Sequence, residues 1–423
     1  MEVNYTYDIV DIAKAFHNFK HLNLNLQELQ NRTFDPRSPD YLKSIGVFAA
    51  WPILALLIIL VLYLLISLFV CCCCSGDKKR EGIKVECKVF IFLFGLVCGL
   101  SFIAGLYGDW ELREAIKRVR SATDDGIDWF DAVRDNVSEV LKVLEVEDDM
   151  KGLKDELQKI YTYQLPPDVK SSVKDAIGTC ETIESNIKDS SKQIADARKE
   201  LDQAKIDFIR EYIDDYGDKF CIAVLVVLLV LAIIGLVFTF AICSRCLLGC
   251  FTVLAVLALI LGSLIAAVTM SASVILSDAC YEVKPWAKAE LNNEQIYNYV
   301  VECLDNNIVS VHIDWAKNLV KLSNDQYKTY DSLIEQLKIY YPEMAAELTS
   351  KKQPLDNRFQ EINVIMAAFE ELAHCKRIND DLNDCMSAIC TDGVKGVVMI
   401  LFNTIASSVC FTVLVFSATF ALR

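Results

Sequence analysis

Residues 47–70 read VFAAWPILALLIILVLYLLISLFV, and Cys71-Cys72-Cys73-Cys74 follow directly. No charged side chain interrupts this run. A helix rises about 1.5 Å per residue, so the run is longer than the roughly 30 Å of hydrocarbon in a bilayer. A buried helix of this length in a soluble protein would carry polar residues on one flank, and this run has almost none. The stretch therefore predicts a membrane-spanning helix.

Four further charge-free runs predict spans at 89–107, 220–242, 247–276 and 396–422. The composition agrees with a membrane protein, because 53% of the 423 residues are hydrophobic. The rest of the chain divides into a polar tail, a cysteine-rich basic loop, a tight turn and two long regions. These segments are 1–46, 71–88, 243–246, 108–218 and 277–395.

Lysine and arginine in the short connections set the expected orientation of the spans. They occur in the segment 77–84 (DKKREGIK), at Arg245 and at Arg423. All three positions fall on one side of the membrane if the N-terminus lies outside. We therefore expect an extracellular N-terminus, a cytosolic C-terminus and two large extracellular regions.

The net charge of −15 argues against nucleic acid and against anionic lipid surfaces as partners, since both attract basic patches. Most of this charge is expected on a solvated extracellular surface. Binding of divalent cations is the alternative for part of it.

Three glycosylation sequons begin at Asn4, Asn31 and Asn136. All three lie on segments that the lysine and arginine distribution places outside, so each is a predicted glycosylation site. Residues 1–46 lack the apolar core of a cleavable signal peptide. The first span is expected to act as its own insertion signal.

The cysteines next to the expected cytosolic ends of the spans leave three interpretations open. Reversible palmitoylation of Cys71, Cys72, Cys73 and Cys74 is the prediction we favour. A zinc site at Cys243-x-x-Cys246 would need a second pair of cysteines beside it. Packing as small apolar side chains is the third interpretation. Disulfides are not expected in a reducing cytosol.

Both long regions show helical periodicity and no strand pattern. In the first region, a seam with spacings of three and four residues follows Ile187, Ser190, Ile194, Ala197, Leu201, Ala204 and Phe208. In the second region, Pro342 and Pro354 are expected to bound a short connection. Trp51 and Pro52 are expected in the first turns of the first span. The sequence thus predicts an all-α fold: five transmembrane helices and two helical extracellular regions that form a bundle tied by disulfides.

Cysteines in the expected extracellular regions predict disulfides, because that compartment is oxidising. Cys280 follows the fourth span and Cys390 precedes the fifth, so these two are expected to meet at the membrane surface. Cys303 with Cys375 would then tie the two helical limbs of the second region. For the remaining pair, three states stay open: bonded to each other, bonded between protomers, or free. That pair is Cys180 and Cys385.

Catalytic motifs are absent from the sequence, so we expect no enzyme and no cofactor other than Ca²⁺. The five runs also contain no Asp, Glu, Lys, Arg or His. Pumps and proton-coupled transporters usually carry such residues within the membrane. The most polar side chain of the spans is Asn403, and ion conduction has no positive signal in the spans themselves.

Four short motifs at span borders resemble the tweety family. They are Asp35-Pro36-x-x-Pro39-Asp40-Tyr41, Gly105-Leu106-Tyr107-Gly108-x-x-Glu111, Ser277-Asp278-x-Cys280 and Cys390-x-Asp392-Gly393-Val394-x-Gly396. Together with five spans and two helical regions of similar size, the resemblance covers essentially the whole chain. Prominins share the five spans and a cysteine-rich first inner loop, but their outside loops are much larger.

The resemblance implies a plasma-membrane homodimer that conducts chloride with a calcium or volume linkage. It also implies the pairings Cys280–Cys390 and Cys303–Cys375, and an apolar pocket suited to lipid. The family's calcium-linked acidic pair falls on Glu111 and Glu114, which share one helix face at i and i+3. A solvated acidic helix start is the alternative interpretation of that pair.

Two hypotheses about function follow. An anion channel needs basic residues near a mouth, and the compact cluster above the second span is Lys117, Arg118 and Arg120. A non-conducting dimer that binds lipid or serves adhesion is the alternative, favoured by the charge-free spans.

Overall fold

The computed structural model describes residues 7–29, 34–73, 85–202, 217–240, 245–290, 294–304, 308–372 and 374–421. The chain divides into two compact units. The membrane unit comprises Met1–Thr123, Ile209–Glu290 and Leu382–Arg423, and the loop unit comprises Asp124–Phe208 and Leu291–Asp381. Each unit is described by itself below.

The predicted all-α fold is confirmed. Throughout the described residues the elements are helices, and β pairing is limited to an isolated bridge between Leu22 and Glu28. In the described part of the chain, five helices are long and apolar enough to cross a membrane, and each overlaps one of the five charge-free runs.

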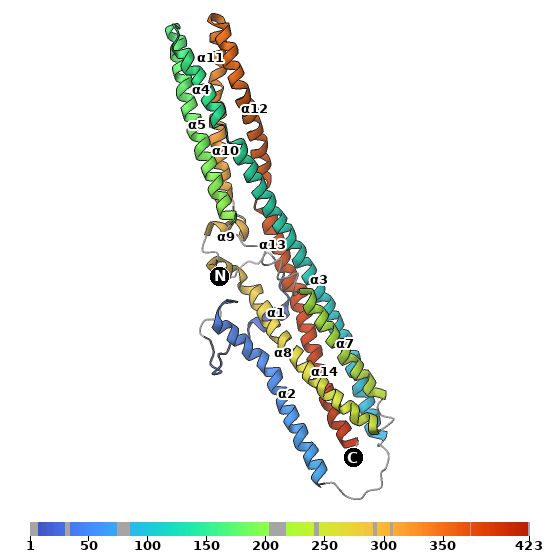
Figure 1. Ribbon diagram of the computed structural model, residues 1–423. Coiled ribbons are helices and arrows are strands. Elements are labelled where there is room, and N and C mark those ends of the chain that lie inside the picture. Colours follow the sequence, from blue (N-terminus) through green and yellow to red (C-terminus); the bar gives the residue numbers. More distant parts are fainter. Residues whose placement is uncertain are drawn as a thin grey trace. The chain divides into compact units, whose positions relative to one another are not determined.

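The membrane unit is built from long apolar helices and a short N-terminal one (Figure 1). Its elements are α1 (Asp11–His17), α2 (Pro39–Cys73), the first part of α3 (Val85–Val143), α7 (Asp218–Phe240), α8 (Arg245–Glu290), the end of α13 (Lys376–Ala388), the π-helical turn η3 (Ile389–Gly393) and α14 (Val394–Ala421).

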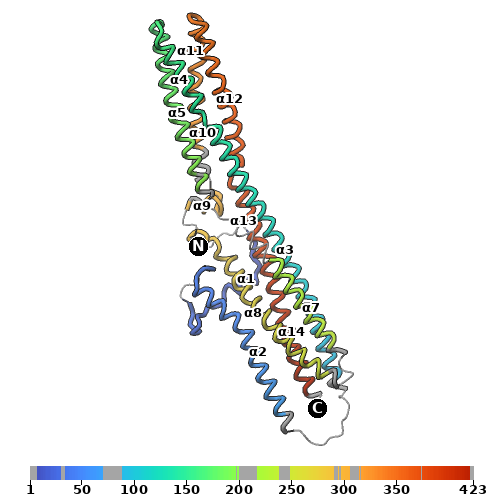
Figure 2. The backbone as a smooth tube through the Cα atoms, in the orientation of Figure 1, coloured from blue at the N-terminus to red at the C-terminus, as the bar shows by residue number. Residues whose placement is uncertain are grey.

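Helix α8 is the centre of this unit, because α1, α2, α7 and α14 all pack against it. Figure 2 shows its backbone passing between α2 and α14. The sequence permits this, since α8 buries small side chains along its length that let neighbouring backbones approach closely. These are Ala255, Ala258, Ala266, Ala267 and Ser273.

Helices α3 and α14 also approach closely, at two glycines. A Cβ atom added to Gly396 would lie 2.7 Å from both Gly108 O and Leu112 N. A Cβ atom on Gly108 would lie 2.8 Å from Gly396 O. Only a residue without a side chain fits on either helix at this crossing.

The loop unit is a bundle of amphipathic helices. Its elements are the second part of α3, α4 (Glu147–Tyr161), α5 (Pro167–Asp202), α9 (Glu294–Val300), α10 (Ile308–Tyr327), α11 (Thr329–Tyr340), α12 (Pro342–Leu372) and the start of α13. Ile187, Ser190 and Ile194 of the predicted seam are buried on α5. The side chains of Ala197 and Leu201 lie outside the described part, as do residues 203–216 with Ala204 and Phe208.

Aromatic side chains with satisfied polar atoms anchor the core of the loop unit. The indole Nε1 of Trp129 donates a hydrogen bond to Leu372 O at 2.9 Å. The hydroxyl of Tyr330 donates to Ala176 O at 2.8 Å. Both side chains are fully buried, so these bonds fix which helices meet.

Two expectations about prolines were wrong. Pro354 lies inside α12 rather than ending a connection. The helix continues through it because Leu348, Leu355 and Phe359 on both sides are buried in the core, which outweighs the loss of one helical hydrogen bond. Pro52 likewise lies inside α2, which already begins at Pro39.

Candidate functional sites in the membrane unit

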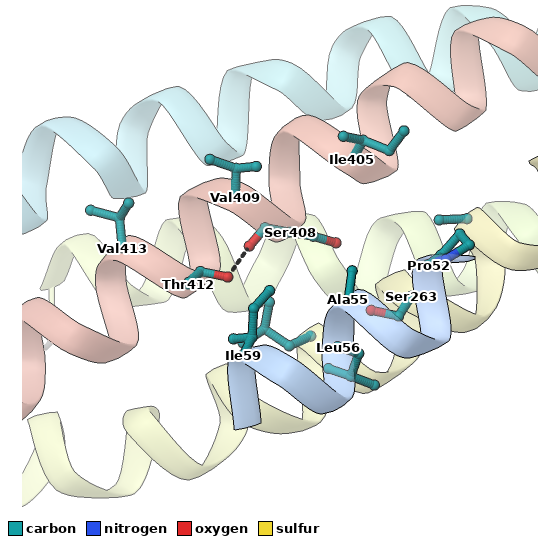
Figure 3. A pocket seen from close by; sticks show the side chains of 12 residues that line it. Pro52, Ala55, Leu56, Ile59, Ser263, Ile405, Ser408, Val409, Thr412 and Val413 are labelled. Atoms are coloured by element: carbon teal, nitrogen blue, oxygen red, sulfur yellow. Dashed lines mark hydrogen bonds between the residues drawn. The ribbon is translucent and has the colours of Figure 1, made fainter. Parts of the chain in front are cut away.

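A groove runs between α2, α8 and α14 (Figure 3). It has a volume of about 250 Å³. Helix α2 contributes Pro52, Ala55, Leu56 and Ile59, α8 contributes Leu259, Ser263 and Ala266, and α14 contributes Ile405, Ser408, Val409, Thr412 and Val413. Ile405 and Val409 remain 44% and 57% exposed. The groove therefore opens onto the apolar flank of the helices.

The walls of the groove are apolar except for three hydroxyls. Ser408 Oγ donates to Thr404 O at 2.8 Å, and Thr412 Oγ1 donates to Ser408 O at 2.7 Å. Figure 3 draws the second of these bonds, which lies within α14. Both hydroxyls thus donate their hydrogen bonds to backbone carbonyls of their own helix. None of the residues that line the groove is ionisable. Such walls suit a hydrocarbon chain better than an ion.

The acidic pair predicted from the sequence occupies the end of the second span, and its two members differ. Glu111 is buried, and its Oε1 accepts a hydrogen bond from Lys395 Nζ of α14 at 2.6 Å. Lys395 also donates to the Tyr107 hydroxyl at 3.3 Å. Hydrogen bonds from Lys395 and Tyr107 lower the pKa of Glu111 below its ordinary value. Glu114 is exposed, 3.9 Å from Lys117 Nζ.

Glu111 and Glu114 do not belong to any group of three or more metal-ligating side chains within the part of the chain that is described. The group that does meet this condition is Cys303, His374 and Cys375, of which the two cysteines form a disulfide. A calcium ion at Glu111 would have to displace Lys395.

The basic cluster is largely neutralised. Arg118 Nη1 lies 2.8 Å from Asp392 Oδ2, and Arg120 Nη2 lies 3.0 Å from Asp218 Oδ2. The Lys117 side chain is 70% exposed, and among the described residues its one ion-pair contact is the long one with Glu114. The three residues therefore lie together, but Lys117 offers the most accessible charge.

A second buried polar cluster was missed in the sequence. Asp278 of α8 is buried, and its Oδ2 accepts a hydrogen bond from the Tyr41 hydroxyl at 2.9 Å. His17 Nδ1 lies 3.0 Å from Oδ1, and His21 Nε2 lies 3.2 Å from Oδ2. The motif Ser277-Asp278-x-Cys280 contained the aspartate, but nothing in the sequence paired it with histidines of the N-terminal tail.

Burial and hydrogen bonding oppose each other in this cluster. Burial raises the pKa of Asp278, but hydrogen bonds from His17, His21 and Tyr41 outweigh that effect, and its pKa is lowered overall. For Glu282, one turn further along α8, burial dominates and raises the pKa. Asp278 is thus the anion around which the N-terminal residues gather.

The two predicted disulfides are present. Cys280 bonds to Cys390 within the membrane unit, with Cα atoms 5.6 Å apart. Cys303 bonds to Cys375 within the loop unit, with Cα atoms 5.3 Å apart. Cys180 and Cys385 are free, and Cys180 is buried.

Modification sites predicted from the sequence are only partly visible. Asn136 is part-buried within α3, and its Nδ2 donates to Ala132 O at 2.9 Å. Asn4, Asn31, Cys74 and Cys243 lie outside the described residues, as do the side chains of Cys71, Cys72, Cys73 and Cys246.

Asn403 lies deep in α14, at the face that meets α3. A Cβ atom on Gly105 would lie 2.4 Å from its Nδ2. Neither amide atom has a hydrogen-bond partner among the described residues. One turn further along α14, the hydroxyls of Ser101 and Ser407 are 3.1 Å apart. The Ser101–Ser407 contact thus joins α3 and α14, and the Asn403 amide lies against the backbone of α3 at Gly105.

Comparison with known families gives one match. The family model described as Tweety matches residues 10–422. No curated protein matches the chain.

Proposed function

Because this chain belongs to the Tweety family, we propose that it is a plasma-membrane protein that binds a lipid acyl chain in the groove between α2, α8 and α14. The groove carries the proposal. Its walls are apolar, its two α14 hydroxyls are bonded within that helix, and it opens onto the apolar flank where lipid chains surround a membrane protein. In the bilayer, such a surface is filled by hydrocarbon.

A photoreactive fatty acid tests this proposal. Full-length protein in lipid nanodiscs is labelled with a diazirine fatty acid, and the labelled residues are mapped by mass spectrometry. Labelling is expected on α2, α8 and α14 at the groove. Ala55→Trp fills the groove and should reduce labelling there several-fold, because an indole occupies the volume of the chain.

Leu64→Trp is the matched control. Leu64 is 59% exposed on the same helix and does not line the groove. The control should label at the groove as the wild type does. Equal groove labelling in the wild type and Ala55→Trp, with both proteins folded, would refute a bound chain.

Anion conduction is the second candidate. The resemblance to a chloride-channel family supports it, and so does the exposed charge of Lys117 beside Arg118 and Arg120. Lys117 would attract chloride to one end of the spans, while Arg118 and Arg120 are paired with Asp392 and Asp218. Calcium would act through Glu111 and Glu114, by displacing Lys395 from Glu111.

Chloride flux from liposomes distinguishes the two candidates. Purified protein, of the mass expected for the homodimer that the resemblance implies, is measured with and without calcium. If the protein conducts, the combined change Lys117→Gln, Arg118→Gln and Arg120→Gln should lower flux, while Lys142→Gln, on an exposed turn of α3, should not. Flux no greater than from empty liposomes would exclude conduction and leave the lipid proposal standing.

A further inference from the structure

The N-terminal clasp, residues 7–29, is held on the membrane unit by contacts far apart in sequence. The hydroxyl of Tyr7 donates to Cys280 O at 2.9 Å, and Val10 N donates to Cys390 O at 3.4 Å. The clasp thus lies over the Cys280–Cys390 disulfide. Beyond it, the backbone N–H of Phe34 donates to the Glu282 carboxylate.

The polar centre of the clasp is the Asp278 carboxylate. His17, His21 and Tyr41 all contact it. In the described part of the chain no lysine or arginine forms an ion pair with it. An anion this deeply buried needs a compensating positive charge, and the two imidazoles are the groups in place to supply one.

The hydrogen-bond geometry around His21 accommodates a proton on each ring nitrogen. Ser44 Oγ donates to Tyr41 O at 2.7 Å, and a hydroxyl has one proton. His21 Nδ1, 2.9 Å from the same Oγ, must then donate to it. His21 Nε2 donates to Asp278 only if the ring carries a second proton. A doubly protonated His21 beside an ionised Asp278 satisfies all these contacts.

The charge balance points the same way. With both imidazoles protonated, they offset the carboxylates of Asp278 and Glu282. With both neutral, the two carboxylates have no cation paired with them among the described residues. The other titratable groups nearby are Tyr41 on α2, Tyr281 on α8, stacked on His17 with ring centres 4.6 Å apart, and Asp11 on α1, close enough to act on Tyr281. η3 and α14 contribute the apolar side chains Ile389, Val394, Val398 and Leu401.

We propose that the part-buried His17 and the buried His21 and Asp278 form a proton-binding site that closes the N-terminal clasp when the imidazoles are protonated and loosens it when they are neutral. Imidazole ordinarily changes charge between roughly pH 5 and 8. Uptake of protons by these imidazoles therefore tightens the clasp as the medium acidifies.

Hydrogen exchange of the full-length protein in nanodiscs tests the proposal. Exchange of clasp peptides is measured at roughly pH 6, 7 and 8 and corrected for the intrinsic rate, with peptides from α12 as internal reference. Clasp protection should fall with rising pH, by up to about tenfold per pH unit for each linked proton. The α12 peptides should not respond.

The double change His17→Gln and His21→Gln keeps hydrogen-bond donors but cannot take up a proton, so its clasp protection should not depend on pH. Lys20→Gln, which removes an exposed pair with Glu28, should respond as the wild type does.

Gel filtration and mapping of the Cys280–Cys390 disulfide establish that each variant is folded. A wild-type change of less than about twofold between pH 6 and 8 overturns the proposal. A folded double variant whose clasp protection depends on pH as in the wild type also overturns the proposal. If the double variant does not fold, the wild-type series decides.

Discussion

The pair of Glu111 and Lys395 shows how one side chain fixes the environment of another. The Glu111 side chain is 8% exposed, whereas that of Lys395 is 41% exposed. The lysine thus brings its charge from the surface to an acid that is almost out of solvent. Removing the lysine leaves a buried carboxylate with Tyr107 as its remaining described neighbour.

Lys395→Met should lower the stability of the membrane unit by about 1–3 kcal/mol, the cost of a buried group left unpaired. Lys395→Arg should retain most of the wild-type stability, because arginine can also pair with Glu111. The apparent midpoint of thermal unfolding in detergent measures both. Lys328→Met, which breaks an exposed pair with Asp325, is the control and should change little. Equal midpoints for Lys395→Met and Lys328→Met would contradict this prediction.

The same pair has a pH signature. Because the folded-state pKa of Glu111 is lowered, its contribution to stability is complete above its ordinary value of about 4.3. That contribution is lost as the pH falls through the lowered value. The difference in midpoint between wild type and Lys395→Met should therefore shrink on acidification below about pH 4.

At the residue scale, the sequence predicted which residue types matter but not which side chains they contact. The motif around Glu111 and the pair Cys280–Cys390 were identifiable from span borders. Cys303 and Cys375 were paired as a tie between the helical limbs of the second region, which the family resemblance also implied. Lys395 was not predicted as the partner of Glu111, nor were His17 and His21 as partners of Asp278. These contacts join residues far apart in the chain, and no local pattern records which of them the tertiary packing brings together.

At the scale of elements, the crossing of α3 and α14 depends on Gly108 and Gly396. Gly396→Ala places a methyl group against the backbone of α3 and should destabilise the membrane unit by about 1–3 kcal/mol. It should also weaken the pairs Lys395–Glu111 and Arg118–Asp392, which lie beside the crossing. Thermal unfolding of the purified protein measures the loss.

Gly46→Ala is the control, because nothing lies within 4 Å of a Cβ atom at that helical position in α2. There alanine should be neutral or stabilising by up to about 1 kcal/mol. If the two changes have the same effect, the contact at Gly396 does not limit the approach of the helices.

Helices were the most predictable feature of the chain. Charge-free runs located the spans, and apolar periodicity located the helices of the loop unit, because both signals are local. The prediction that Pro354 ends a helix was wrong because it, too, rested on a local signal. A local rule ends a helix at proline, but burial of Leu348, Leu355 and Phe359 keeps α12 continuous.

At the scale of the molecule, each compact unit contains its own disulfide. Cys303–Cys375 closes a loop with a sequence separation of 72, and Cys280–Cys390 one of 110. Loops of this size restrict the unfolded chain enough to stabilise by about 2–5 kcal/mol. The groove and the clasp both belong to the membrane unit, which the Cys303–Cys375 bond does not enter.

The double change Cys303→Ser and Cys375→Ser should therefore loosen the loop unit selectively. Hydrogen exchange should speed up in peptides from 124–202 and 308–372 and stay close to wild type in α8 and α14. An equal loss of protection in both units would show that they unfold together.

The long separation between Tyr7 and Cys280 has a consequence for biosynthesis. The two residues lie 273 positions apart, and a ribosome adds roughly 5–20 residues per second. The beginning of the nascent chain therefore waits some tens of seconds before its binding surface exists. The surface is complete only when Cys390 has also been translated and oxidised. During that interval His17, His21 and the apolar residues beside them remain available to chaperones and to quality control. Maturation of this protein should accordingly be sensitive to changes near its N-terminus long after that end has left the ribosome.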